Sequence, residues 1–144
     1  MSKPNKDITY FSQLLRDRDL RATTFRLNLL TCLQAYHSAM PHAAIQSAME
    51  PIDRVTLYRT LDSLIQKGII HKAYQEGSNI YYAICDENCD SSHHHEHLHF
   101  RCSVCETVTC QLPSHALKIS IPDYEVHNID IRVDGVCKSC KRKS

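Results

Sequence analysis

The sequence predicts an α+β protein in two parts, an N-terminal winged helix-turn-helix domain and a smaller, strand-containing C-terminal part that binds metal. Three observations lead to this prediction. The first half reads as helices followed by a β-hairpin, which is the element order of a winged helix. The cysteines are distributed unevenly, because only Cys32 precedes position 85 and the other seven follow it. The charge divides at the same place: residues 1–84 hold 10 Lys and Arg against 7 acidic residues, whereas residues 85–144 hold 7 against 9.

Length and composition narrow the class of protein. A chain of 144 residues suffices for one ordinary domain or two small ones. Only 3 glycines and 5 prolines argue against a disordered or fibrous chain, and no apolar run approaches the roughly 20 residues that a membrane helix needs. The first ten residues hold no apolar signal core, so we expect a cytoplasmic protein with no membrane partner. In that reducing compartment, paired cysteines indicate metal ligands more often than disulfides.

Start and stop signals place three helices in the first half. Thr23 can cap a helix that runs to about Tyr36, and Pro41 suits the first turn of a short second helix. Asp53 can cap a third helix, which Gly68 ends.

Strand-like runs follow these helices. Two of them flank a turn at Glu76-Gly77-Ser78 and predict the hairpin, or wing. Three further runs are expected in the second half, with a short helix opening at Pro113 between them. The five runs are Ile69–Tyr74, Asn79–Ile84, Leu98–Ser103, Thr107–Cys110 and Tyr124–Val133.

The third helix has one apolar face and one face suited to reading DNA. At about 100° per residue, Arg59 lies opposite the apolar stripe and Tyr58 lies on its flank. Arginine can bond guanine in the major groove, and tyrosine can contact a thymine methyl or a phosphate. The alternative is an ordinary amphipathic helix with a solvated arginine; the hairpin behind it favours DNA binding. The apolar stripe is Leu57, Leu61, Leu64 and Ile65, and arginines available to DNA phosphates are Arg16, Arg18, Arg21 and Arg26.

Two Cys-x-x-Cys pairs predict a structural zinc site. Each pair supplies two thiolates from a tight turn, and two pairs complete a tetrahedral set with no open position. Redox-active pairs and disulfides are the alternatives. The first lacks a thioredoxin-like βαβ pattern, and the second is disfavoured in a reducing compartment. The pairs are Cys102 with Cys105 and Cys137 with Cys140, separated by residues 106–136.

A histidine cluster directly before the first pair predicts a second metal site. If a strand begins near Glu96, His95, His97 and His99 point to one face. Cys110 follows Cys105 by five residues and can reach that face, while Cys85 and Cys89 lie at the boundary between the two halves. Imidazole and thiolate together suit zinc. The alternative, adventitious binding, is favoured for His93 and His94. Cys32 is read as packing, and His71 and His115 have no grouping that singles them out.

These motifs together resemble the ferric uptake regulator family of bacterial metal-dependent repressors. The resemblance extends from about Leu20 to Cys140, and the order and spacing of its motifs make it specific. The matching motifs are Arg21-Ala-Thr23-Thr-Phe-Arg26, Thr56-Leu-Tyr58-Arg59-Thr60-Leu61, His97-x-His99-x-x-Cys102-x-x-Cys105 and Gly135-Val-Cys137-x-x-Cys140.

The resemblance implies a winged-helix domain at 1–84, a hinge at 85–96 and a metal-binding dimerisation domain of α/β type at 97–144. It implies a homodimer on an A·T-rich palindromic DNA operator, with a structural zinc and a second, regulatory metal between the domains. By the same resemblance, Tyr58 and Arg59 contact bases, with Thr56 in the same motif, and Arg21 reaches a minor groove. His97 and His99 are implied as regulatory ligands.

The sequence departs from the family at other regulatory positions. The family's early histidine falls on Ala39, and its acidic ligands fall on Ala83 and Cys110. Thiols in place of carboxylates favour zinc over iron(II) or manganese(II) and indicate the zinc-uptake-regulator branch. The expected regulatory ligands are His97, His99, Cys110 and Cys85, with Cys89, His42, His37 and His95 as further candidates.

We therefore expect a zinc-responsive repressor of metal-uptake genes, with no catalytic residue and no small-molecule substrate. The alternatives are an iron-, manganese- or peroxide-sensing regulator of the same family and a metal-storage module. A zinc-dependent enzyme is more remote, because Glu96 is the only acidic residue in the histidine cluster and no His-Glu-x-x-His motif occurs.

Overall fold

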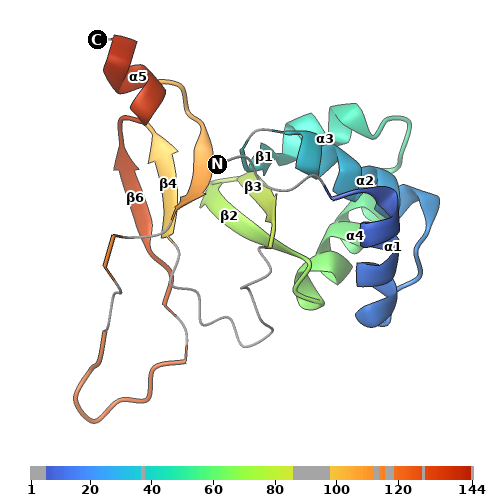
Figure 1. Ribbon diagram of the computed structural model, residues 1–144, viewed down its shortest axis with the longest axis horizontal. Coiled ribbons are helices and arrows are strands. Elements are labelled where there is room, and N and C mark those ends of the chain that lie inside the picture. Colours follow the sequence, from blue (N-terminus) through green and yellow to red (C-terminus); the bar gives the residue numbers. More distant parts are fainter. Residues whose placement is uncertain are drawn as a thin grey trace.

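The computed structural model describes residues 6–36, 38–85, 98–111, 114–115, 119–127 and 129–143. They form two units (Figure 1), each built around its own three-stranded sheet. The N-terminal unit (residues 6–85) adds four helices to its sheet, and the C-terminal unit (residues 98–143) adds one short helix. Among the described helices, none has the length and apolar character needed to cross a membrane. The α+β fold class predicted from the sequence is confirmed.

Side-chain caps fix the helices of the N-terminal unit where the sequence predicted them. Thr23 accepts a hydrogen bond from the backbone N–H of Arg26, and Asp53 accepts one from Thr56 at 2.8 Å. Gly68 has a φ of 70°, as the end of the third predicted helix requires. Pro41 precedes its helix as N-cap instead of opening the first turn. The helices are α1 (Ile8–Asp17), α2 (Thr24–Ala35), α3 (His42–Ala48) and α4 (Arg54–Gln66).

The apolar core of the N-terminal unit joins all four helices to the sheet. Leu57, Leu61 and Leu64 of α4 are buried, as their spacing predicted. Helix α1 was not predicted, yet Phe11 and Leu15 from it are fully buried in the same cluster. Their burial makes α1 part of the winged-helix core.

The wing is the hairpin of β2 (Ile70–Glu76) and β3 (Asn79–Ile84), turned through Gly77 at a φ of 60°. A short strand β1 (Met40–Pro41) pairs on the other side of β3, giving the order β1-β3-β2. The pairing of β2 with β3 shifts between Lys72 and Tyr74, which is a β-bulge.

The C-terminal unit has the strand order β5-β4-β6, with β4 and β6 parallel. The predicted strand Tyr124–Val133 is wrong over most of its length, because in the described part of this run (124–127 and 129–133) only the last two residues belong to a strand, β6. Tyr124 is 75% exposed, so the apolar residues of that run do not mark a buried strand face. The helix predicted at Pro113 opens outside the described residues. The elements are β4 (Leu98–Cys102), β5 (Val108–Gln111), β6 (Arg132–Gly135) and α5 (Lys138–Lys143).

The two units meet through β2 and the segment before α3. Ala39 and Ala73 of the N-terminal unit are buried in one small cluster with Val108 of β5. The backbone N–H of Ala39 donates a hydrogen bond to the carbonyl of Val108 at 2.8 Å. This contact positions the face of β2 against the C-terminal sheet.

Candidate metal centres and nucleic-acid interface

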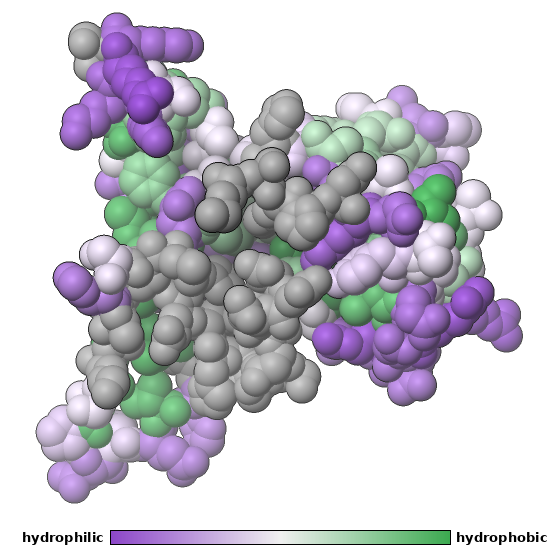
Figure 2. All heavy atoms as spheres, viewed as in Figure 1, coloured by the Kyte–Doolittle hydropathy of each residue, from purple (hydrophilic) through white to green (hydrophobic). Residues whose placement is uncertain are grey.

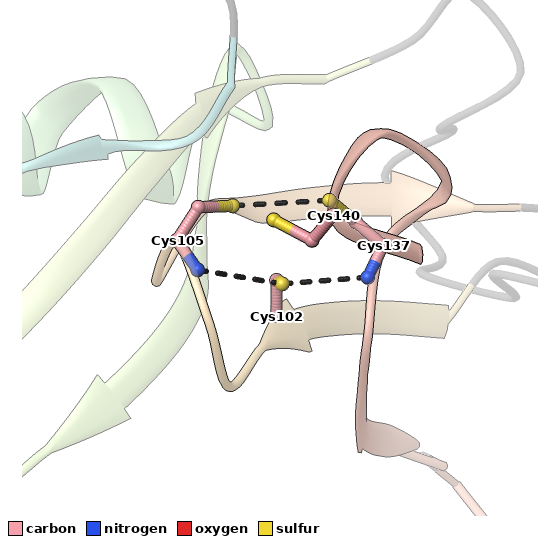
Figure 3. A group of neighbouring side chains, drawn as sticks. All are labelled: Cys102, Cys105, Cys137 and Cys140. Carbon is pink, nitrogen blue, oxygen red and sulfur yellow. Dashed lines mark hydrogen bonds between the residues drawn. The ribbon is translucent and has the colours of Figure 1, made fainter. Parts of the chain in front are cut away.

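Four cysteines of the C-terminal unit converge on one point (Figure 3), each sulfur within 4.8 Å of the others. Cys102 ends β4 and Cys105 lies in the following turn, while Cys137 precedes α5 and Cys140 lies within it. The Sγ atoms of Cys105 and Cys137 are 3.8 Å apart. Zinc–sulfur bonds of about 2.3 Å in a tetrahedron place sulfurs about 3.8 Å apart. The group therefore has the dimensions of a structural zinc site.

Backbone amides prepare this group to hold a cation. Cys102 is fully buried, and its Sγ accepts N–H bonds from Val104, Cys105 and Cys137 at 3.3–3.5 Å. The amides of Cys105 and Cys137 lower the pKa of Cys102 to about 6. The side-chain hydrogen bond to Cys137 raises the pKa of Cys140 to about 12. Four thiolates this close repel one another, and a divalent cation removes that repulsion. The donor set fits zinc.

A second group brings together His71, His99 and Cys110, one ligand atom of each lying within 4.8 Å of the others. His99 and Cys110 are opposite each other on paired strands β4 and β5, whereas His71 comes from β2. The Nε2 atom of His71 lies 3.3 Å from the Sγ of Cys110, and the two imidazole rings are 5.2 Å apart. The ligand atoms of this mixed group thus come from both units.

Two further residues support this group. The Sγ of Cys85 lies 3.4 Å from Nδ1 of His71, on the opposite side of the ring from Cys110. Cys85 is buried, and its N–H bonds the carbonyl of Ile69 at the base of the hairpin. Asp130 lies 3.5 Å from Nδ1 of His99, an arrangement that leaves Nε2 of His99 as its metal-facing atom.

Sequence reasoning passed over His71, because its position depends on the β-bulge of the wing. A regular hairpin with Glu76 opposite Asn79 would pair His71 with Ile84 and would place His71 and Cys85 on opposite faces. The register shift between Lys72 and Tyr74 pairs Ile70 with Ile84 instead, which brings His71 next to Cys85.

Of the other predicted regulatory ligands, His42 lies elsewhere in the structure and the rest lie outside the described residues. His42 is not in the mixed group of the described residues: its ring stacks on Tyr58 of α4 at 4.9 Å, and burial lowers the pKa of His42. The candidates that lie outside the described residues are His97, His95, His37 and Cys89.

Helix α4 carries the residues predicted to read DNA. Tyr58 is 54% exposed and Arg59 is exposed, while Leu57 between Thr56 and Tyr58 is buried. The hydroxyl of Thr56 donates a hydrogen bond to Asp53 at 2.6 Å, so its hydrogen-bond donor is engaged in the helix cap. The backbone carbonyl of Arg21 accepts a hydrogen bond from the side chain of Arg26. The side chain of Arg21 is exposed. An exposed aromatic and arginine on a helix followed by a wing match the geometry of a winged-helix reader.

Comparison with known proteins agrees with this fold and these sites. The model of the ferric uptake regulator family matches residues 17–132, which is most of the chain. The chain belongs to the ferric uptake regulator family. Members of this family are metal-responsive DNA-binding transcription regulators, so the expectation that the protein is not an enzyme is confirmed. No curated protein matches the chain.

Solved structures similar to this chain share its fold at low sequence identity. A zinc uptake regulator complexed with zinc and DNA is 19% identical, with a TM-score of 0.73 over 94% of this chain and 93% of that one. The holo form of XcZur is also 19% identical, with a TM-score of 0.66 over 94% and 96%. The ferric uptake regulator of Vibrio cholerae is 22% identical, with a TM-score of 0.59 over 88% and 98%.

Proposed function

We propose that this family member is a zinc-responsive repressor of metal-uptake genes, in which a second zinc ion joins the two units. The observation that carries the proposal is the mixed group of His71, His99 and Cys110, whose ligand atoms come from both units and are imidazole or thiol only. A metal bound by all three residues holds β2 of the wing against the C-terminal sheet.

The chemistry of the mixed group favours zinc over iron(II) or manganese(II). Carboxylate and other oxygen ligands suit manganese, whereas imidazole and thiolate suit zinc. The carboxylate of Asp130 lies 3.5 Å from Nδ1 of His99 and is 64% exposed. We assign His71, His99 and Cys110 as ligands, with Cys85 as a fourth that rotation of the His71 ring or of the thiol brings to the ion. His97 stays a proposed ligand on the strength of the family motif.

Zinc then acts as a ligand with different affinity for two arrangements of the protein. The three ligands meet only when the units are in contact, so zinc stabilises that arrangement over any in which they are apart. Two winged helices held at a fixed angle in a dimer match half-sites spaced along one face of the duplex. Repression when zinc is abundant follows from this linkage.

The C-terminal unit supplies the proposed homodimer contact. Exposed apolar side chains gather along its outer edge, the green surface at the left of Figure 2. A second copy of this unit would cover them, which is the usual fate of an exposed apolar patch. The most exposed are Val104, Ile119, Ile121, Tyr124 and Val136. We retain 1–84, 85–96 and 97–144 as winged-helix domain, hinge and dimerisation domain, and the cytoplasm as the location.

Helix α4 is the proposed DNA reader. Tyr58 and Arg59 contact base edges from its exposed face, Thr56 contacts the backbone beside them, and Arg21 reaches an adjacent minor groove. The zinc site and this helix are separate, so DNA contact and zinc response can be removed independently.

A zinc titration tests the proposal. Protein that holds only the structural ion is titrated with buffered zinc, and operator affinity is measured by fluorescence anisotropy. We expect affinity to rise with zinc in the wild type, and His71→Ala to abolish the rise while the structural zinc remains. His115→Ala is the matched control, because His115 is exposed and outside both cysteine-containing groups.

Two further arms separate the competing functions. Arg59→Ala should weaken operator binding by about 1–3 kcal/mol at every zinc concentration, without moving the zinc midpoint. An affinity that rises with iron(II) or manganese(II) and not with zinc would identify an iron or manganese sensor. Operator affinity that no metal changes would contradict the proposed switch.

A further inference from the structure

A second connection between the two units lies three residues along β2 from His71. The ring of Tyr74 faces two arginines of the C-terminal sheet, Arg132 of β6 and Arg101 of β4. The guanidinium carbon of Arg132 lies 4.2 Å from the centre of the ring, and that of Arg101 lies 5.6 Å from it. Both distances fall within the range of cation–π attraction.

The β-bulge in the wing presents Tyr74 to the arginines. The pairing shift after Lys72 lets Ala73 and Tyr74 both contact the apolar cluster between the units. Tyr81 packs edge-on against the ring of Tyr74 at 5.7 Å and holds it from the β3 side. Tyr74 is thus fixed within the N-terminal unit before it meets the arginines.

Arg132 makes two contacts with β2. Besides lying over the Tyr74 ring, it donates a hydrogen bond to the carbonyl of Gln75 at 3.1 Å. Together the two contacts restrict both the distance and the orientation of the wing relative to β6; Figure 1 shows where these two elements lie. A planar guanidinium is suited to this combination of stacking and directed bonding.

Arg101 is held on the other flank of the contact. One terminal nitrogen lies 3.4 Å from Glu106, while its Nε is buried and has no hydrogen-bond partner among the described residues. A buried N–H without a partner costs free energy unless a π face or another negative surface compensates it. The Tyr74 ring, whose centre is 5.6 Å from the guanidinium carbon of Arg101, supplies an aromatic face beside this group only while the units are together.

We propose that Tyr74, Arg101 and Arg132 form a metal-independent clamp that sets the zinc concentration at which the protein responds. The inference rests on the proposed zinc switch. The clamp raises the fraction of molecules in which His71 already faces His99 and Cys110. The apparent dissociation constant for a ligand equals its intrinsic value divided by that fraction. A stronger clamp therefore lowers the zinc needed, and Tyr74 is a positioning residue for the metal site.

Tyr74→Leu, compared with Tyr74→Phe, isolates the aromatic ring. The leucine variant should need about three- to tenfold more free zinc for half-maximal operator binding, the change expected from losing partly exposed cation–π contacts. Its affinity at saturating zinc should match the wild type within about twofold, since zinc then supplies the closure. The phenylalanine variant keeps the ring and should show the wild-type midpoint. Equal midpoints for all three proteins would overturn the clamp.

Arg132→Gln tests the same contact without altering the winged-helix unit. It should raise the zinc midpoint, and the double variant should raise it by less than the sum of the two single effects, because both single changes remove the contact between Arg132 and Tyr74. If the two single effects on the zinc midpoint add up in the double variant, the two residues act separately, which would contradict the clamp. If both variants bind the operator more weakly than the wild type even at saturating zinc, the two residues are needed for folding and not for the clamp.

The Ala39 amide gives a readout that needs neither regulatory zinc nor DNA. Its hydrogen bond to Val108 crosses between the units, so its hydrogen exchange reports their separation. In protein holding only the structural ion, exchange at Ala39 should be about three- to tenfold faster in Tyr74→Leu than in Tyr74→Phe. Exchange at Leu61 in the core should be unchanged. Unchanged exchange at Ala39 overturns the clamp, whereas zinc-independent operator binding of the wild type overturns only the proposed function.

Discussion

The two metal-binding groups of this protein differ in where their ligands come from. All four cysteines of the Cys102 group belong to the C-terminal unit, two of them around the end of β4 and two around the start of α5. Backbone amides from both segments already bond the sulfur of Cys102. The mixed group takes His71 from the wing and takes His99 and Cys110 from the C-terminal sheet. The ligands of the first group therefore all lie within one unit, whereas those of the second group come from both units.

This difference separates a structural role from a regulatory one. A tetrahedral thiolate set leaves no open position, and its metal contributes to the folding of the unit that holds it. A site divided between two units binds best when they are in contact, so its metal changes their relative arrangement. The predictions below test whether the two groups can be disturbed independently.

The largest effect is expected from Cys102→Ser. This sulfur is fully buried and accepts three backbone N–H bonds, and a serine hydroxyl does not replace a thiolate on zinc. The variant should lose the structural zinc, the ordered sheet β5-β4-β6 and the dimer. The N-terminal unit should stay folded on its own apolar core. Zinc content, gel filtration and hydrogen exchange of β4 amides measure this.

Cys32→Ser is the matched control for that experiment. Cys32 is partly buried on α2, 3.9 Å from the sulfur of Met40, and belongs to neither metal group in the described part of the chain. It should keep the full zinc content and the dimer. A folded, zinc-loaded C-terminal unit in Cys102→Ser would show that the four-cysteine group is not structural.

An intermediate effect is expected from Cys110→Asp, which changes the mixed group alone. The substitution replaces a soft thiolate ligand with a hard carboxylate, so zinc affinity at this site should fall about tenfold to a hundredfold. The preference should move toward iron(II) or manganese(II), with the structural zinc retained. Competition between metals, followed by the cobalt–thiolate absorption band, measures the change.

Thr109→Asp places the same charge on the neighbouring position of β5 and serves as its control. Successive residues of a strand point to opposite faces, so this carboxylate should leave the metal preference unchanged. If Cys110→Asp keeps the wild-type order of metals, the thiol is not the reason for zinc selectivity.

Local signals in the sequence account for what could be predicted. The caps Thr23 and Asp53, the glycine turn of the wing and the two Cys-x-x-Cys pairs act within a few residues, and the structure contains each of them. His99 and Cys110 also follow from local spacing, because a tight turn makes them opposite neighbours. These features depend on short-range chemistry that single residues specify.

Features that depend on packing between distant segments were not predicted. Helix α1 is a different case, because Asp7 caps it and Phe11 and Leu15 are spaced i, i+4 on one face, which are local signals that the sequence reasoning passed over. His71 gains its significance from contact with Cys110, 39 residues later in the chain. The run ending at Val133 has high strand propensity, yet among its described residues a strand forms only where the chain pairs with β4. Tertiary contacts decide the cases of His71 and of the run ending at Val133.

The smallest effect is expected from Asp130→Asn, at the edge of the mixed group. Its carboxylate lies 3.5 Å from Nδ1 of His99 and can orient that ring and raise its basicity toward a metal. Because the side chain is 64% exposed, solvent screens the interaction, and zinc affinity should fall only about two- to fivefold. The asparagine oxygen still accepts a hydrogen bond, so the orientation of the ring should be kept.

Asp134→Asn removes the same charge from β6 at another exposed position and should leave zinc affinity unchanged. Calorimetry of the second zinc at low and moderate salt distinguishes the two variants, since a screened charge effect should shrink as salt rises. Among the described residues, the hydrogen bonds of the four-cysteine group involve backbone amides, Thr107 and the cysteines themselves and no carboxylate, so this group should respond to neither variant. A hundredfold loss in Asp130→Asn would instead make Asp130 a ligand, and the mixed group would then contain the hard oxygen donor that favours manganese(II).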